Sequence, residues 1–224
     1  KYTIPHYWGT LGILYNTRLV DEEVDSWDIL FNQKYSGQII MENSVRDSFV
    51  PALKLLGYSI NTDNTDELDE AEAMLKEQRP MVQAYLLDSA RDEMIAENAA
   101  IALVYSGEAP YATEYNEDLA YVVPKEGSNV WVDSWAITKD CKNTENAEKF
   151  LNYLLEVEIS KISFEYNHYG TPNKKLAEIL PAKYTEDPAL FPPSDVLDNC
   201  EIFKSLDQGT QNYYSKLWKE IKLD

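Results

Sequence analysis

The chain alternates between short continuous apolar runs and longer polar stretches in which apolar residues return every three or four positions. The short runs predict buried strands over 10–16, 37–42, 82–87, 101–106 and 119–124. The helical spacing predicts helices over 47–57, 66–79, about 88–98, about 144–157 and 210–221. Strands that alternate with helices are typical of an α/β sheet.

The helix over 66–79 has recognisable ends. Asn64 or Thr65 can cap its start, because their side chains accept hydrogen bonds from the free N–H groups of a first turn. Pro80 is expected to end it. The apolar face of this helix consists of Leu68, Ala71 and Leu75.

The helix over 47–57 is interrupted by a proline. Asp47 lies near its start and Gly57 is expected to act as its C-terminal cap, since glycine adopts the left-handed conformation that ends many helices. Pro51 lacks an N–H group and is expected to confine the regular part of this helix to its C-terminal side.

Two later helices also have an apolar face. The helix over about 144–157 carries Phe150, Leu151, Leu154 and Leu155 on one side. The helix over 210–221 carries Tyr213, Tyr214, Leu217, Trp218 and Ile221, which are expected to face inward. The adjacent tyrosines could also form an iron-chelating pair, but neighbours on a helix diverge by about 100° and both fall on the apolar stripe. We therefore favour core packing for both.

Composition limits the partners of this protein. The 224 residues include 39 acidic and 20 basic side chains, which gives a formal charge of −19. Such a charge argues against binding to nucleic acid or to an anionic membrane surface, and it leaves cationic ligands allowed. A hydrophobic content of 44% is ordinary for a globular protein, and no apolar run is long enough to span a bilayer.

The two cysteines and the first residues give further expectations. Cys141 and Cys200 are too few and too far apart for a zinc site or a CxxC redox motif, so they either pair or remain free. The start at 1–12 enters an apolar run almost at once and carries no leader or lipidation signal, which suggests a trimmed fragment.

No motif of an enzyme is found. The sequence lacks GxSxG, HExxH, a P-loop and GxGxxG, and its histidines, His6 and His168, lie near no cysteine or serine motif. Pairs of carboxylates occur throughout so acidic a chain, so their spacing does not indicate a glycosidase. We expect no catalysis, no cofactor and no metal.

The segment 129-NVWVDSWA-136 places a carboxylate between two indoles. In a strand, Trp131, Asp133 and Trp135 would share one face. The face is either ordinary packing beside a solvated acid or a receptor for an organic cation. Removing an ammonium from water costs several kcal/mol, whereas one aromatic face returns about 0.5–2 kcal/mol. A cation site therefore needs acids and aromatics side by side.

Two tyrosines lie at positions suited to a ligand. Tyr105 ends the strand over 101–106 just before a Ser-Gly turn, and open α/β sheets bind ligands at the carboxyl ends of their strands. Tyr169 lies at the edge of a turn whose backbone is fixed by Gly170 and Pro172. For each residue taken alone, an ordinary structural role is the default interpretation.

Taken together, several segments resemble the solute-binding proteins of spermidine/putrescine ABC transporters. The resemblance runs from about residue 4 to the end. Its most specific part is the combination PKEG, W-x-D-S and TPN. The segments are 5-PHYWGTLGILYNT-17, 39-IIMENSVRDSF-49, 101-IALVYSGEA-109, 124-PKEGSNVWVDSWAI-137 and 169-YGTPN-173.

The resemblance implies a fold of the periplasmic-binding-protein type II, in which a mixed sheet in each lobe is flanked by helices and the ligand lies between the lobes. Residues 7–124 would form the second lobe. Residues 125–180 would cross to the first lobe and contain the W-x-D strand, and residues 181–224 would return as helices that pack on the second lobe. The front part of the first lobe would be missing from this chain.

The resemblance also implies five ligand-binding residues. Trp131 and Asp133 fall on the family's W-x-D, whose indole packs on the polyamine and whose acid binds an amine. Asp47 matches a glutamate that pairs with the same end of the ligand. Tyr105 stands where the family usually has a tryptophan, and Tyr169 matches the tyrosine before the T-P-N turn. Trp135 is expected to have a packing role.

Two positions depart from the family's pattern. Ser44 replaces a frequent second carboxylate, and 201-EIF-203 replaces a Glu-Trp-Gln context whose glutamine helps to bind the far amine. These losses should weaken the hold on one amine or change the preferred chain length. Spermidine, putrescine and other linear amines all remain open.

The function implied is capture of a polyamine by the extracytoplasmic component of an ABC importer. Its partners would be the polyamine and the membrane permease, with no nucleic acid, and it would act as a monomer in the periplasm or at the cell surface. The alternatives are a protein of the same fold that binds a ferric ion or an amino acid, and a carboxylate-based hydrolase.

Overall fold

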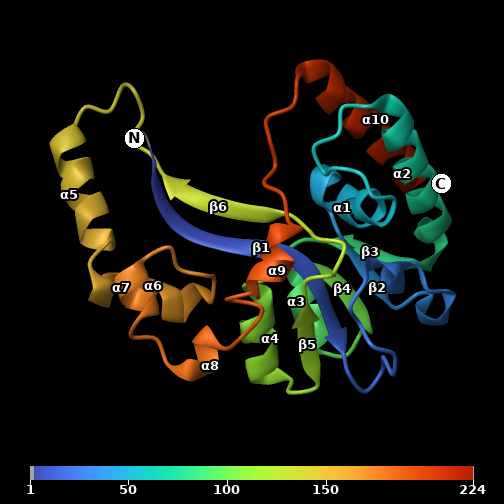
Figure 1. Cartoon of the computed structure of the whole chain (residues 1–224), viewed down its shortest axis with the longest axis horizontal. Helices are drawn as coiled ribbons and strands as arrows, with labels where there is room; N and C mark the ends of the chain where they lie inside the picture. The colour runs from blue at the N-terminus through green and yellow to red at the C-terminus, as the bar shows by residue number, and fades with distance from the viewer. Residues whose placement is uncertain (1–2, 224) are drawn as a thin grey trace.

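The structure is a computed structural model and describes residues 3–223. The predicted α/β sheet is present, and the chain continues beyond it into an arm that carries a second group of helices (Figure 1). The strands are β1 (Ile4–Asn16), β2 (Ile39–Glu42), β3 (Val82–Leu86), β4 (Ile101–Tyr105), β5 (Leu119–Val122) and β6 (Val130–Trp135). The strand β6 is the W-x-D strand that the resemblance implied.

The helices divide between the sheet and the arm. Those that cover the sheet are α1 (Val45–Leu55), α2 (Thr65–Gln78), α3 (Ser89–Ile95), α4 (Glu108–Tyr115) and α10 (Gln208–Leu223). The rest are α5 (Thr144–Leu154), α6 (Val157–Asn167), α7 (Lys174–Ala177), α8 (Ala182–Thr185) and α9 (Ser194–Asp198). Short 3₁₀ turns are η1 (Trp27–Phe31), η2 (Gln33–Tyr35) and η3 (Arg79–Met81). Among residues 3–223, no helix combines the length and apolar character needed to cross a membrane.

The long strand β1 connects the two parts of the molecule. The sheet order is β3-β2-β4-β1-β5, with β2 parallel to β3 and β4, and β1 antiparallel to β4 and β5. The C-terminal half of β1 pairs with β4 and β5, whereas its N-terminal half leaves the sheet and pairs with β6. The β1–β6 ribbon therefore forms the arm (Figure 1).

Alternation along the strands explains why helices cover both faces of the sheet. In β4, Ile101 and Leu103 join the core on the side of α1, whereas Ala102 and Val104 join the core on the side of α3 and α4. Successive side chains of a strand point to opposite faces, so a continuous apolar run needs a hydrophobic layer on each side. The fold expected from the pattern of strands and helices is confirmed.

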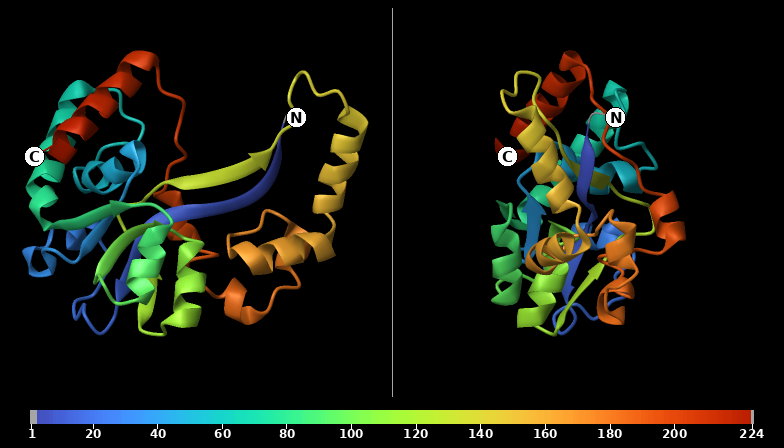
Figure 2. Two further views of the ribbon diagram at one scale, coloured as in Figure 1. Left: turned by 180° about the vertical axis from the view of Figure 1, so that it is seen from behind. Right: turned by 90° about the vertical axis from the view of Figure 1, so that its left-hand side faces the viewer.

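The helix α10 packs against α1 and α2, although it comes from the far end of the chain (Figure 2). Its inward face consists of Tyr214, Leu217, Trp218 and Ile221, as predicted. Tyr213 is only partly buried and donates a hydrogen bond to Asp69 at 2.6 Å. The two adjacent tyrosines therefore have packing and hydrogen-bonding roles.

The prediction for Pro51 was wrong. The helix α1 runs without a break from Val45 to Leu55 with Pro51 inside it. Burial of Phe49, Val50 and Leu53 outweighs the backbone hydrogen bond that a proline removes. The expected cap is confirmed, because Gly57 has φ +78° directly after this helix.

The arm carries helices that are much less buried. Phe150 and its apolar neighbours share one face of α5 as predicted, but α5 has no buried residue, and Phe150 is 57% exposed. The helices α6 to α8 have a small core of their own, made of Phe164, Leu176, Leu180 and Leu190. Cys141 and Cys200, whose pairing was open, are both free thiols.

Candidate functional site

The five residues predicted to bind ligand surround one cavity of about 430 Å³. It lies where the β1–β6 arm leaves the sheet, and the elements that form it are far apart in the sequence. Trp131, Asp133, Asp47, Tyr105 and Tyr169 all line it, together with Asp88, Asn129 and Phe203. The structure thus brings together every residue that the resemblance selected.

Trp131 forms the centre of the cavity wall. It lies on β6 opposite Gly9 of β1, and a Cβ atom at position 9 would come within 2.7 Å of the indole. Glycine at this position therefore lets the ring lie against the backbone. The indole meets Tyr105 edge-on with ring centres 6.0 Å apart and meets Tyr169 in the same way at 5.1 Å. The three rings form a nearly continuous aromatic wall.

Asp47 is fixed in the first turn of α1. It is 6% exposed, and its Oδ2 accepts hydrogen bonds from Ser44 at 2.5 Å and from the phenol of Tyr105 at 3.0 Å. Burial is the main cause of a raised pKa at Tyr105, and the charge of Asp47 adds to it. Tyr105 is therefore a phenol at neutral pH and holds the carboxyl group in place.

Tyr169 is fixed by a second hydrogen-bonded acid. Its phenol donates to Glu108 at 3.0 Å, and Arg91 donates to the other oxygen of the same carboxyl at 2.9 Å. The ring lies directly on Gly107 at the start of α4, where a Cβ atom would overlap it. Burial, and then the charge of Glu108, raise the pKa of the Tyr169 phenol.

A buried acid that the sequence reasoning missed lies behind the site. Glu42, the last residue of β2, is only 3% exposed, and its Oε2 has no hydrogen-bond partner among the described residues. Burial is the main reason that the pKa of this carboxyl is raised to about 8. The charges of Asp47, Asp88 and Glu108 add to the shift. Glu42 is therefore largely uncharged below neutral pH.

Asp88 was also missed, although the sequence contained a signal for it. It lies two residues after the end of β3, a strand of the parallel part of the sheet, and ligands gather at the carboxyl ends of such strands. It precedes α3 as its N-cap residue, yet its side chain makes no capping hydrogen bond and lines the cavity. Asp133 and Asp88 are exposed, whereas Asp47 is buried.

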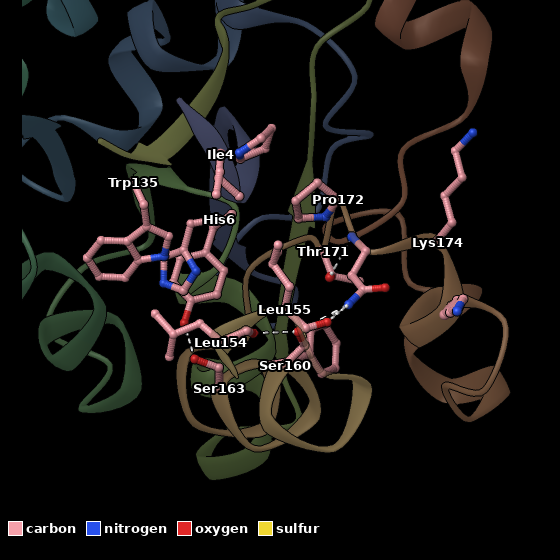
Figure 3. Close-up of a pocket in the computed structure, with 15 residues that line it drawn as sticks. Ile4, His6, Trp135, Leu154, Leu155, Ser160, Ser163, Thr171, Pro172 and Lys174 are labelled. Atoms are coloured by element: carbon pink, nitrogen blue, oxygen red, sulfur yellow. Dashed lines mark hydrogen bonds between the residues drawn. The ribbon is translucent and has the colours of Figure 1, made fainter. Parts of the chain in front are cut away.

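Trp135 does not line this cavity. Its indole contacts the ring of His6 in a tilted arrangement with ring centres 4.6 Å apart and lines a second cavity of about 430 Å³ on the arm (Figure 3). The packing role expected for Trp135 agrees with this contact. The two indoles predicted to share one strand face thus line two different cavities, and the pairing of β1 with β6 has a register shift between Pro5 and Tyr7.

The second cavity has a different chemical character. Its wall combines apolar side chains, such as Leu154 and Leu155, with the amines of Lys174 and Lys175, and within residues 3–223 no carboxyl side chain lines it. Ser160, labelled in Figure 3, accepts a hydrogen bond from Asn173 at 3.1 Å. A cation would find no counter-charge there, so the cavity at Trp131 is the better candidate site.

The fold and the site can be compared with known proteins. The family model described as bacterial extracellular solute-binding protein matches residues 1–192, which is more than half of the chain. The chain belongs to this family. Its members are binding proteins, and the α/β sheet with a cavity beside it agrees with membership.

Individual members of the family show strong similarity. The chain is 32% identical over 220 residues to the spermidine/putrescine-binding periplasmic protein of Escherichia coli, a match that covers 96% of this chain and 63% of that protein. It is 30% identical over 240 residues to a putrescine-binding periplasmic protein of Pseudomonas aeruginosa, covering 99% of this chain and 65% of that protein. The chain thus spans less than two thirds of either relative.

The solved structures agree with this assignment of the fold. A putative spermidine/putrescine ABC transporter protein from Listeria monocytogenes superposes with a TM-score of 0.92 at 39% identity, over 100% of this chain and 69% of that one. A spermidine/putrescine substrate-binding protein from Streptococcus pneumoniae gives 0.91 at 37% identity, with the same coverage. The periplasmic-binding-protein fold predicted from the sequence is confirmed.

Both departures expected within the family have visible consequences. Ser44 donates a hydrogen bond to Asp47, so the position offers a hydroxyl where a second charge was expected. Phe203 lines the cavity with an aromatic ring, and Glu201 is turned away to accept from Lys54 at 3.1 Å. One end of this cavity is therefore more apolar than the resemblance alone would predict.

Proposed function

We propose that this chain captures a linear polyamine for an ABC importer and that the cavity at Trp131 is its binding site. One observation carries the proposal: the structure gathers aromatic faces and carboxyl groups around a single cavity. Neither kind of group alone would hold a desolvated ammonium, because the cost of removing it from water exceeds what one aromatic ring returns.

The two kinds of group match the two parts of a polyamine. Asp47, Asp88 and Asp133 supply negative charge for ammonium groups, which form short charge-assisted hydrogen bonds with carboxylates. The faces of Trp131 and its neighbouring tyrosines supply apolar area for the methylenes between the amines. Binding is noncovalent and requires no catalysis, cofactor or metal.

The relatives support the same class of ligand. The proteins from Escherichia coli and Pseudomonas aeruginosa are named for binding spermidine, putrescine or both. By analogy, the protein acts outside the cytoplasmic membrane as a monomer and delivers its ligand to a membrane permease. These partners and this location belong to the proposal.

The division into lobes is also part of the proposal. Residues 7–124 would be the second lobe, 125–180 the crossing segment and 181–224 the helical return. The matched portions of the solved relatives amount to 69% of their length. The exposed apolar face of α5, with Phe150 at its centre, is suited to packing against a further part of a two-lobed protein. Closure of two lobes over the cavity would exclude water from the ligand.

Neither alternative is favoured by a specific observation. Among residues 3–223 there is no group of three or more His, Cys, Asp or Glu side chains that could hold a metal ion, so nothing in this part of the chain favours a ferric ligand. Nothing in the site favours an amino acid or a hydrolytic reaction over an amine, and turnover of a sugar or an ester would distinguish a hydrolase.

Thermal unfolding with a panel of solutes tests the proposal. The chain would be heated alone and with spermidine, putrescine, glutamate or ferric citrate. A ligand that binds only the folded state, at a hundred times its Kd, stabilises it by about 2.7 kcal/mol. We expect the unfolding midpoint to rise with a polyamine and to stay unchanged with the other solutes. A rise with glutamate or ferric citrate instead would contradict the proposed ligand.

A further inference from the structure

One of the residues that line the cavity is an asparagine that the resemblance did not select. Asn129 immediately precedes β6 and lines the same cavity as Trp131 and Asp133. The three residues are spaced by two, so their side chains share one face of an extended segment. This face presents an amide, an indole and a carboxyl group in a row.

The amide of Asn129 is buried and incompletely satisfied. The residue is 2% exposed, and its Oδ1 has no hydrogen-bond partner among residues 3–223. Buried polar atoms in folded proteins nearly always have a partner, so an acceptor that lines a cavity without one indicates a missing donor. A ligand N–H group is a donor of the required kind.

The backbone holds this side chain in place. The carbonyl of Asn129 accepts from the N–H of Leu11 at 3.1 Å, and Asn129 also forms an isolated bridge with Glu201 on its other side. Val130 then donates to the carbonyl of Glu201 at 2.9 Å. With neighbours on both sides, the main chain that carries this amide is held in place, which is a property that a specificity-determining residue needs.

The spacing along the strand sets a length. Four residues at about 3.3 Å each separate the Cα atoms of Asn129 and Asp133 by roughly 13 Å. A saturated chain advances about 1.2 Å per bond, as judged from the extended backbone. On that basis the five bonds between the nitrogens of putrescine span about 6 Å, and the nine bonds between the terminal nitrogens of spermidine span about 11 Å.

We infer that Asn129 accepts a hydrogen bond from the amine farthest from Asp133 and so selects triamines over diamines. This rests on the proposed function, since it assigns one end of the same site. Because side chains stand roughly perpendicular to a strand, amines held at Asp133 and Asn129 would lie about as far apart as the two Cα atoms, a separation that the span of spermidine approaches and that of putrescine does not. Putrescine held at the same carboxyl ends near the indole and leaves the amide unused.

Isothermal titration of the chain with spermidine and with putrescine tests this inference. Asn129→Leu removes the amide at similar size, and Asn152→Leu, which changes an exposed asparagine of α5, is the matched control. We expect Asn129→Leu to raise the Kd for spermidine about tenfold and the Kd for putrescine less than twofold. The control should change neither. Because the Oδ1 atom that the variant removes is unpaired in the free protein, the unfolding midpoint without ligand should stay level or rise.

The outcomes separate this inference from the proposed function. Equal weakening for both amines, or a spermidine Kd within twofold of the unchanged chain, would overturn the role of Asn129 and leave polyamine capture standing. Binding of neither amine by the unchanged chain would overturn both. If Asn129→Leu does not unfold cooperatively, Asn129→Ala takes its place in the same comparison.

Discussion

At the scale of single residues, Glu42 shows how the site is arranged for a cation. Its carboxyl is buried beside the acids of the cavity, and its pKa is raised to about 8. A charged Glu42 would suffer both desolvation and repulsion from Asp47, Asp88 and Glu108, so the neutral form is favoured in the free protein. Keeping so many acids near one cavity therefore lowers the stability of the folded protein.

This arrangement predicts a pH dependence of stability. The ordinary pKa of a glutamate, 4.5, applies to the unfolded chain, and the folded value is about 8. The stabilising contribution of neutral Glu42 to the free energy of unfolding is therefore fully present below about pH 4.5 and is lost as the pH rises through about 8. We expect Glu42→Gln, which mimics the neutral acid, to reduce the fall in unfolding free energy between pH 5 and pH 8.

Urea denaturation at several pH values would measure this effect, and Glu148→Gln on the exposed face of α5 is the matched control. The control should keep the pH dependence of the unchanged chain. If Glu42→Gln has the same dependence as well, the neutral buried acid is not present in solution.

At the scale of secondary structure, two helices with similar sequence patterns have different surroundings. The faces of α5 and α10 were both expected from apolar residues at helical spacing. The face of α10 is buried against α1 and α2, whereas the face of α5 is exposed on the arm. Periodicity reports that a helix has an apolar side, but what covers that side depends on the tertiary structure.

The difference predicts unequal effects of truncation. Leu217 of α10 is 2% exposed, and Leu217→Ala should lower the free energy of unfolding by about 2–5 kcal/mol. Phe150 of α5 is 57% exposed, and Phe150→Ala should change the free energy of unfolding by less than about 0.5 kcal/mol. Chemical denaturation compares the two. A large loss for Phe150→Ala would mean that the face of α5 is packed in solution.

The sequence predicted most elements because their signals are local. Asn64 caps α2 by accepting from Asp66, and Gly57 ends α1 with a positive φ, as expected from residue type alone. The continuation of α1 through Pro51 and the existence of α4 were not predicted. Both depend on burial against the sheet, which local pattern does not report.

At the scale of the whole molecule, the site is assembled from distant segments by the long strand β1. This strand pairs with β4 near Tyr105 and with β6 at Trp131 and Asp133, so it holds the residues of one cavity in register. The resemblance found five of the lining residues through motifs. Asp88 lies outside those segments, and Asn129 lies within one of them without an assigned role, so only the folded chain shows that both line the same cavity.

The formal charge of −19 acts over the same scale. It favours the approach of a polycation to any part of the surface, so weak association alone would not demonstrate a site. Specific capture must depend on one carboxyl group, be saturable and persist in salt, because exposed charges are largely screened beyond about 8 Å at physiological ionic strength.

The most direct measurement is therefore isothermal titration of the chain with spermidine in physiological salt, for the unchanged chain, Asp133→Asn and Asp198→Asn. Asp198 is an exposed aspartate of α9, so its variant changes the net charge equally without touching the cavity. Hydrogen bonds to charged groups contribute about 1.5–3 kcal/mol, which corresponds to a loss of affinity of roughly 10- to 100-fold. We predict that spermidine binds at a single site. The loss of affinity should occur in Asp133→Asn and not in Asp198→Asn. Equal affinities for all three proteins would contradict polyamine capture at this cavity.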